Sequence, residues 1–140
     1  LTLIIPQPKE KIADFVSEQT DNTHFPFENY SCIGLLDKNG ELIAGVLYIH
    51  FSGENICAHI AGKEGKRWLT KKFLHAMFDY PFNQLGVQRI TGLVPKSNKD
   101  ARKFDKHLGF KLEGNMRRAL KDDDMLVYGM LKGECKWLKR

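Results

Sequence analysis

The chain has 140 residues, of which 42% are hydrophobic and 28% charged, as is usual for a globular protein. This length fits a single domain, residues 1–140, and suffices to bury a core without disulfides or a structural metal. No stretch approaches the roughly 18 apolar residues of a membrane helix, and the N-terminus lacks the basic lead of a secretory signal. The three cysteines are widely spaced and form no C-x-x-C pair, so we expect no disulfide framework, no metal site and a cytoplasmic location.

The formal net charge is +5, which suits a polyanionic partner such as nucleic acid or a phosphate-rich small molecule. Positive side chains gather between residues 62 and 72, where only Glu64 is acidic. A solvated helix face would explain such a cluster without any ligand, and phosphate binding is the functional interpretation. The positive side chains are Lys63, Lys66, Arg67, Lys71 and Lys72.

The first half of the chain predicts one helix and four strands. In the helix, Ile12, Phe15 and Val16 recur at helical spacing. Asn39-Gly40 joins two apolar runs and favours a type I′ hairpin, because both turn positions need positive φ. The second of these runs is apolar on both faces, as in a central strand. In order, the predicted elements are a strand over 1–5, a helix over 9–19 and strands over 31–37, 42–51 and 55–62.

The second half predicts two helices and three strands, which together with the first half gives a mixed α/β layer structure. Ser97 or Asn98 caps the second of these helices, and Ser97 with Asp100 has the spacing of a capping box. Gly109 stands where a left-handed C-cap is needed. An acidic turn over 121–124 joins the last two strands. In order, the predicted elements are a helix over 66–79, a strand over 87–94, a helix over 98–108 and strands over 110–120 and 124–132.

A glycine-containing loop leads from the strand over 55–62 into the basic helix. Gly62 and Gly65 allow the backbone to approach a ligand closely. Amides in the first helical turn lack partners inside the helix, and the helix dipole favours an anion there. This arrangement predicts a phosphate-binding loop, although the Walker and Rossmann glycine motifs are both absent.

The run "VPKSNKDARKFDKHLGFKLEG" resembles the GCN5-related N-acetyltransferases (the GNAT superfamily). Its E-G-x-x-R continuation, which ends at Arg117, is similar to the branch that acetylates ribosomal-protein N-termini. The ending "YGMLKGECKWL" is similar to compact members from phages and mobile elements. The resemblance covers about residues 30–138. The matching residues are Asn98, Ala101, Phe104, His107, Leu108, Gly109, Phe110, Glu113 and Gly114.

The resemblance implies a mostly antiparallel sheet of six to seven strands with helices on both faces, and acetyl-CoA as acyl donor. In such proteins two central strands splay, and pantetheine pairs with the edge of the strand that corresponds to Ile56–Ala61. Pyrophosphate then lies on the loop that follows. Arg67 departs from the family, which has a small residue there. The implied cofactor-binding residues are Ile60, Ala61, Gly62, Lys63, Gly65, Lys66, Arg67, Trp68, Asn98 and Phe104.

The implied reaction is direct transfer of an acetyl group to a primary amine in a ternary complex. Candidates for the base are Glu54 and His59, of which His59 has the more suitable intrinsic pKa. Asp105 stands where many members place a tyrosine that protonates the leaving thiolate. A carboxyl with its ordinary pKa near 4 is ionised at neutral pH. Either another group therefore serves as the acid, or the thiolate leaves unassisted.

The amine acceptor cannot be deduced from the residues. Phe25, Phe27 and Tyr30 are candidates for one wall of its pocket, and Arg117 is a candidate to meet an acidic acceptor. Trp137 and Leu138, in a basic tail, are candidates for a homodimer contact. The favoured partners are acetyl-CoA and an amine, with no membrane and no nucleic acid. Two alternatives stay open: a basic nucleic-acid-binding module, and a CoA-binding protein without turnover.

Overall fold

A computed structural model describes residues 2–20 and 29–138. Its described part contains one seven-stranded sheet in the order β1-β2-β3-β4-β5-β7-β6. Every neighbouring pair is antiparallel except β4 and β5, so the predicted mixed and mostly antiparallel sheet is confirmed. The strands are β1 (Leu3–Ile5), β2 (Tyr30–Leu36), β3 (Leu42–Ile49), β4 (Asn55–Gly62), β5 (Arg89–Pro95), β6 (Lys111–Leu120) and β7 (Asp123–Leu131).

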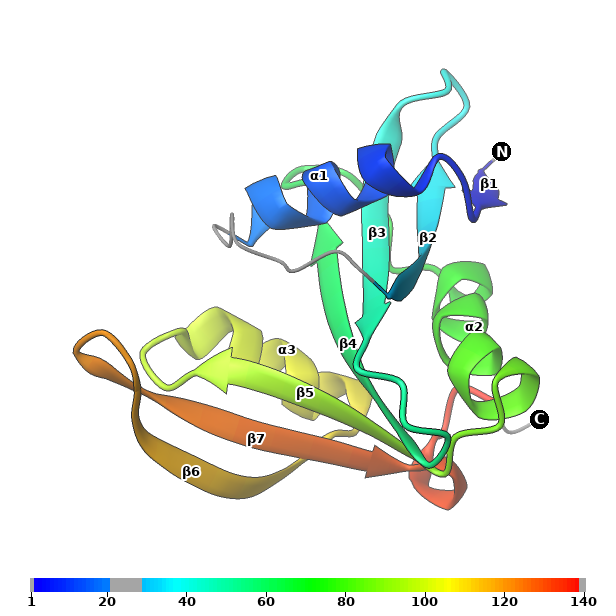
Figure 1. Cartoon of the computed structure of the whole chain (residues 1–140). Coiled ribbons are helices and arrows are strands. Elements are labelled where there is room, and N and C mark those ends of the chain that lie inside the picture. Colours follow the sequence, from blue (N-terminus) through cyan, green and yellow to red (C-terminus); the bar gives the residue numbers. More distant parts are fainter. Residues whose placement is uncertain (1, 21–28, 139–140) are drawn as a thin grey trace.

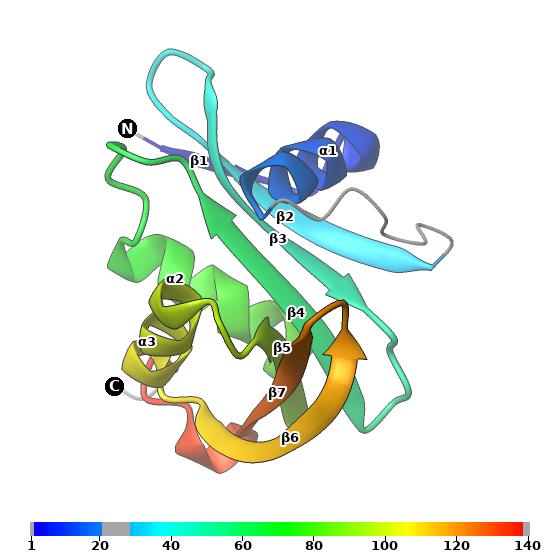
Figure 2. The same cartoon turned by 90° about the vertical axis from the view of Figure 1, so that its left-hand side faces the viewer.

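Helices cover both faces of the sheet, as the resemblance implied. Helix α1 (Lys9–Gln19) crosses one face over β2 and β3, whereas α2 (Lys71–Asp79) and α3 (Lys99–Leu108) lie on the other (Figures 1 and 2). Under α1, Ile12 and Val16 are fully buried beside Leu47 of β3. The larger core lies between the sheet and α2, where Phe73 and Met77 are buried.

The turn between β2 and β3 differs from the predicted type I′ hairpin. Only Gly40 has positive φ, and its amide donates to the Asp37 carbonyl at 3.0 Å. The Asp37 carboxylate accepts from the amides of Asn39 and Glu41, both at 2.9 Å. The loop therefore has three residues, and the side chain of Asp37 holds Asn39 in an ordinary conformation.

Helix α2 begins at Lys71, five residues later than predicted. Gly65 has a φ of 80° and the amide of Lys66 donates to the Lys63 carbonyl, so this segment forms a turn. The Thr70 hydroxyl then accepts from the Phe73 amide at 3.2 Å and caps the helix. The residues before Lys71 fit a helical pattern in the sequence. The turn at Gly65 and the cap at Thr70 keep them outside helix α2.

Both ends of α3 are capped by residues that the sequence pattern predicts, whereas the predicted capping box is absent. The Asn98 side chain accepts from the Ala101 amide, and Gly109 adopts the predicted left-handed conformation with a φ of 111°. Ser97 instead donates its hydroxyl hydrogen to Asp123 at 2.6 Å. The predicted capping box of Ser97 and Asp100 is therefore wrong, because Asp123, the first residue of β7, holds Ser97.

Candidate active site

A cavity opens where β4 and β5 separate. The two strands pair over three residues each, ending at Cys57 and Thr91. Beyond that point β4 stays with β3 as far as Gly62, and β5 stays with β7 as far as Pro95. The facing edges diverge (Figures 1 and 2) and enclose about 870 Å³. The splayed strands implied by the resemblance are present, and no strand of the described residues pairs with the inner edge of β4 there.

The wall on the α2 and α3 side of the cavity is aromatic. Trp68 and Phe104 line it with their ring centroids 5.7 Å apart. A Cβ atom added at Gly62 would lie 1.8 Å from the Trp68 indole. Gly62 is therefore required because the indole packs directly against its backbone, which is a different reason from the phosphate contact that the sequence suggested.

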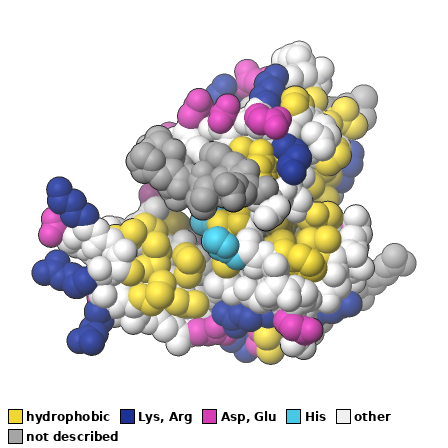
Figure 3. Space-filling model, viewed as in Figure 1, with side chains coloured by type: hydrophobic (Ala, Val, Ile, Leu, Met, Phe, Trp, Pro, Cys, Tyr) yellow, Lys and Arg dark blue, Asp and Glu magenta, His cyan; other side chains and the backbone are white. Residues whose placement is uncertain are grey.

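His59 lines the cavity from β4, opposite Leu47 of β3. Burial, together with nearby His50, lowers the pKa of its imidazole to about 4. The side chain is therefore neutral at neutral pH. Figure 3 shows histidine near the centre of this face, with apolar side chains on both sides. The predicted base candidate thus lies at the cavity, in the protonation state that accepts a proton.

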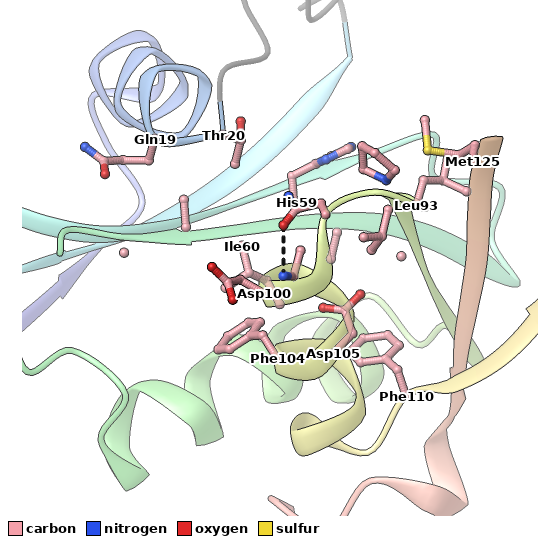
Figure 4. A pocket seen from close by; sticks show the side chains of 18 of the residues that line it. Gln19, Thr20, His59, Ile60, Leu93, Asp100, Phe104, Asp105, Phe110 and Met125 are labelled. Atoms are coloured by element: carbon pink, nitrogen blue, oxygen red, sulfur yellow. Dashed lines mark hydrogen bonds between the residues drawn. The ribbon is translucent and has the colours of Figure 1, made fainter. Parts of the chain in front are cut away.

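Asp105 lines the same cavity from α3, and in Figure 4 its carboxyl group lies across the cavity from His59. Burial alone raises its pKa from 3.8 to about 7. Within residues 2–20 and 29–138, it has no hydrogen bond and no ion pair. One carboxyl oxygen lies 3.1 Å from where a Cβ of Gly92 would be. The ordinary carboxyl pKa assumed from the sequence is therefore wrong for this residue.

The remaining cofactor candidates divide into two groups. Ile60, Ala61 and Asn98 line the cavity; in Asn98 the side-chain oxygen is occupied by the capping bond to Ala101, drawn dashed in Figure 4. The basic loop lies beside the cavity without lining it.

In that loop, Lys63 and Lys66 both approach Glu41, at 3.2 and 3.8 Å. Arg67 is exposed and forms no ion pair with any described residue. A Cβ atom added at Gly65 would meet nothing within 4 Å, so the positive φ of this residue is the reason that a glycine stands there. Arg67 and Lys71 are thus exposed cations without an ion pair to a described residue, whereas Lys63 and Lys66 share Glu41.

Three other predicted site residues are not brought to the cavity. Glu54 is exposed in the turn before β4, where its carbonyl accepts from the Gln88 and Arg89 amides. Tyr30 lies under the Lys9 ammonium group, 4.6 Å from its ring centroid, and lines a separate pocket of about 300 Å³. Arg117 is exposed on β6 and does not line the cavity. Phe25 and Phe27 lie outside the described residues.

A polar network closes the narrow end of the splay. The Thr91 hydroxyl donates to the Asn55 side chain at 2.6 Å and accepts from Arg89 at 3.0 Å. Arg89 in turn pairs with Glu113 at 2.6 Å, directly over Gly129. These contacts join β4, β5 and β6 where the two halves of the sheet meet.

The sequence interpretation missed several cavity residues. Gly92 is one, although a lone glycine inside a strand is a known sign of close approach by another group. Leu93 and Met125 of the second half, and Gln19 and Thr20 at the end of α1, also line the cavity. No local motif marks these four, because only the tertiary arrangement brings them together.

Two negative findings hold for residues 2–20 and 29–138. That part of the chain contains no group of three His, Cys, Asp or Glu side chains that could hold a metal ion. None of its helices is long and apolar enough to span a bilayer. The three cysteines are buried, and none of them is in a disulfide.

The sequence matches no protein-family model and no curated protein. Solved structures do match. A mutant of spermidine N-acetyltransferase SpeG from Vibrio cholerae aligns with a TM-score of 0.78 at 15% identity, covering 99% of this chain and 97% of that one. The same enzyme in complex with CoA and spermine gives 0.73 at 15% identity, covering 95% and 96%. Its dodecameric form gives 0.74 at 14% identity, covering 94% of each chain.

The chain has the GNAT fold. At this level of sequence identity the likeness establishes the fold alone. The C-terminal segment packs on the chain itself. The Trp137 indole donates to the Leu108 carbonyl at 2.8 Å, and Trp137 and Leu138, both half-buried, pack against the chain's own core.

Proposed function

We propose that the protein is an acyl-CoA-dependent N-acyltransferase that moves an acetyl group from acetyl-CoA to a primary amine. The observation that carries this proposal is the cavity between β4 and β5, which combines an unpaired strand edge with two opposed titratable side chains, His59 and Asp105. An extended ligand with amide groups can pair with such an edge as another strand would. The pantetheine arm of CoA is a ligand of that kind.

The volume and the wall of the cavity fit this ligand. About 870 Å³ lies within the range of cofactor and drug-sized sites. Trp68 and Phe104 offer apolar surface to the arm, and Arg67 with the unpaired amides at the start of α2 offers an anion-binding surface at the end toward that helix. Ile60, Ala61, Gly62 and Asn98 complete the proposed cofactor wall.

The reaction requires little covalent chemistry from the protein. The lone pair of a neutral amine attacks the thioester carbon, a C–N bond forms, and the C–S bond breaks with its electron pair on sulfur. Positioning of the two substrates lowers the barrier most. His59, neutral and on the opposite side of the cavity from Asp105, is placed to take the amine proton directly or through water.

The acceptor is proposed only as a primary amine. The structural neighbours are named for spermidine, and one was solved with spermine. The run from Glu113 to Arg117 instead resembles enzymes that acetylate protein N-termini. A panel for assay therefore contains spermidine, spermine, free lysine and short peptides with free N-termini.

Binding of acetyl-CoA followed by release of free thiol tests the proposal. We expect a thermal shift with acetyl-CoA, and amine-dependent thiol release with at least one amine of the panel. Ile60→Trp, which fills the cavity, should abolish the shift. Leu3→Trp is the matched control, because Leu3 is 58% exposed on β1. Absence of binding would contradict the proposal, and binding without thiol release from any amine would favour a CoA-binding protein without turnover.

A further inference from the structure

A second pocket lies where the start of β2 meets the turn after β3 and the segment that follows α2. It encloses about 300 Å³, the lower end of the range of small-molecule sites. Figure 3 shows apolar side chains, tyrosines included, gathered to the right of the central histidine, in the region where Figure 1 places the start of β2. Four aromatic residues from separate parts of the chain line the pocket: Tyr30, Tyr48, Phe51 and Tyr80.

Two of these rings belong to the core and form a fixed floor. The Tyr48 side chain is buried, and its hydroxyl donates to the Met77 carbonyl at 2.6 Å. The Tyr80 ring packs against it with the two ring centroids 5.0 Å apart. The packing of the core explains both residues, and it leaves an aromatic surface at the bottom of the pocket.

Phe51 lines the same pocket from outside the core. Its side chain is 53% exposed. The residue before it, His50, has a φ of 56°, a left-handed conformation that is unfavourable for a residue with a side chain. An exposed phenyl ring that follows a strained backbone residue adds little to stability. Strain of this kind is often found at binding sites, where a ligand contact supplies the reason to keep it.

The pocket already accommodates one cation, which the chain itself supplies. The Lys9 Nζ atom lies 4.6 Å from the centroid of the Tyr30 ring. Lys9 lines the pocket and forms no ion pair with any residue of 2–20 or 29–138. The negative face of an aromatic ring attracts such a charge. The position of Lys9 therefore shows where an ammonium group is stable in this pocket.

The charges around the Tyr30 ring also favour a cation. Glu10 and Asp14 are exposed on α1. Burial is the main cause that raises the pKa of the Tyr30 hydroxyl, and the carboxylates of Glu10 and Asp14 raise it further. These two carboxylates outnumber the single ammonium group of Lys9, so the surroundings of the ring stay negative while Lys9 is in place.

We propose that this pocket binds an organic ammonium ion that carries methyl groups, and that Lys9 occupies the cation position when no ligand is bound. Methyl groups weaken the hydration of the charge, so such an ion leaves water easily and gains from contact with aromatic faces. Tyr30 and Phe51 supply the faces at the rim, and the two core tyrosines supply the floor. This pocket and the cavity share no lining residue, so the proposal does not depend on acetyl transfer.

Choline and its uncharged analogue test the role of charge. In the analogue a carbon atom replaces the nitrogen, so the two alcohols have nearly the same shape. In NMR titrations at constant ionic strength we expect choline to bind the wild-type protein roughly tenfold more tightly than the analogue, with shifts in the ring signals of Tyr30, Phe51 and Tyr80. Equal affinities would overturn the proposal, because the pocket would then select an apolar shape.

Phe51→Leu tests the aromatic face, because it keeps an apolar side chain and removes the ring. We expect the Kd for choline to rise roughly fivefold. Leu112→Ala is the control for a change in exposed apolar surface, since Leu112 is 56% exposed on β6 and lines neither pocket. An unchanged Kd in Phe51→Leu would contradict the proposal, and so would an equal rise in Leu112→Ala.

Lys9→Met tests whether Lys9 occupies the cation position. The variant keeps an unbranched side chain and removes the ammonium group that choline has to displace, so the Kd for choline should fall roughly fivefold. Lys11→Met is the matched control, because Lys11 is exposed on the same helix and does not line the pocket. A Kd in Lys9→Met that is unchanged or higher would overturn the proposal. The same holds for an equal fall in Lys11→Met, and for a lack of choline binding by both the wild type and Lys9→Met.

Discussion

Burial acts in opposite directions on the two titratable side chains of the cavity. Desolvation disfavours the charged form of each group, so it lowers the pKa of His59 to about 4 and raises that of Asp105 to about 7. At neutral pH His59 is therefore neutral, and Asp105 is about half protonated. This separation is the pattern expected of an acid and a base that act in one reaction.

The same two pKa shifts predict how stability depends on pH. Between pH 3.8 and about 7, folded Asp105 keeps a proton that the unfolded chain releases, so the free energy of unfolding falls as pH rises. Between about 4 and 6.5 the unfolded chain binds a proton at His59 that the folded chain does not, so there stability rises with pH. In the wild-type protein these two effects oppose each other between about pH 4 and 6.5.

Asp105→Asn removes one of the two effects. We expect the variant to gain stability as pH rises from 4 to 6.5, and to exceed the wild type above pH 7 by a few kcal/mol, at roughly 1.4 kcal/mol per pKa unit. Urea unfolding at pH 4.5, 6 and 8 measures this difference. Parallel curves for the two proteins would show that Asp105 titrates as an ordinary aspartate.

Gly62 offers a second test at the level of a single residue. Gly62→Ala places a methyl group 1.8 Å from the Trp68 indole, which is itself held by Phe104 and Phe73. We expect the free energy of unfolding to fall by about 1–3 kcal/mol, as is typical of overpacking, and the affinity for CoA to fall as the indole moves into the cavity. Denaturant unfolding and a CoA titration measure the two effects.

Gly133→Ala is the control for Gly62→Ala, because an added Cβ at Gly133 meets nothing within 4 Å. Equal effects of the two substitutions would show that helix or strand propensity, and not the indole contact, decides the outcome.

At the level of elements, local signals predicted α3 well and α2 only in part. Asn98 caps the start of α3 and Gly109 caps its end, and each cap involves only backbone groups that are close in the sequence. The start of α2 depends on Gly65 adopting positive φ and on Thr70 as a cap. The basic residues before α2 suit a helix and a turn equally well, so the sequence does not show which of the two they form. The outcome depends on how the loop packs against Gly62.

The network at the closed end of the splay predicts how firmly β4 and β5 are joined. Thr91→Val removes the hydroxyl that connects Asn55 with Arg89, so the Asn55 oxygen loses its bond at a partly buried position. We expect a loss of about 1–3 kcal/mol in the free energy of unfolding. Thr91→Ser keeps the hydroxyl and should recover most of this loss. Equal stability of the two variants in urea unfolding would show that the network contributes nothing.

At the level of the whole molecule, the cavity arises from the way the two parts of the sheet meet. β1 to β4 form one part and β5, β7 and β6 the other, and in the described part of the chain the strand pairing between them comprises three residue pairs. The apolar pattern of β4 and β5 predicts that both are strands, but not that their pairing stops at Cys57 and Thr91. For the same reason the burial of Asp105 could not be foreseen, because it depends on Gly92, in another strand, facing α3.

The distribution of charge over the molecule predicts that CoA binding weakens with salt. The net charge is +5, but Lys63 and Lys66 are occupied by Glu41, which leaves Arg67 as an exposed cation without an ion pair in the described loop. An exposed charge–phosphate contact is screened by salt, so the Kd for CoA should rise between 50 and 500 mM NaCl. Arg67→Ala should raise the Kd roughly fivefold at low salt and reduce its salt dependence. Lys132→Ala, at an exposed position immediately after β7 that does not line the cavity, is the control, and an equal effect there would show that only the net charge matters.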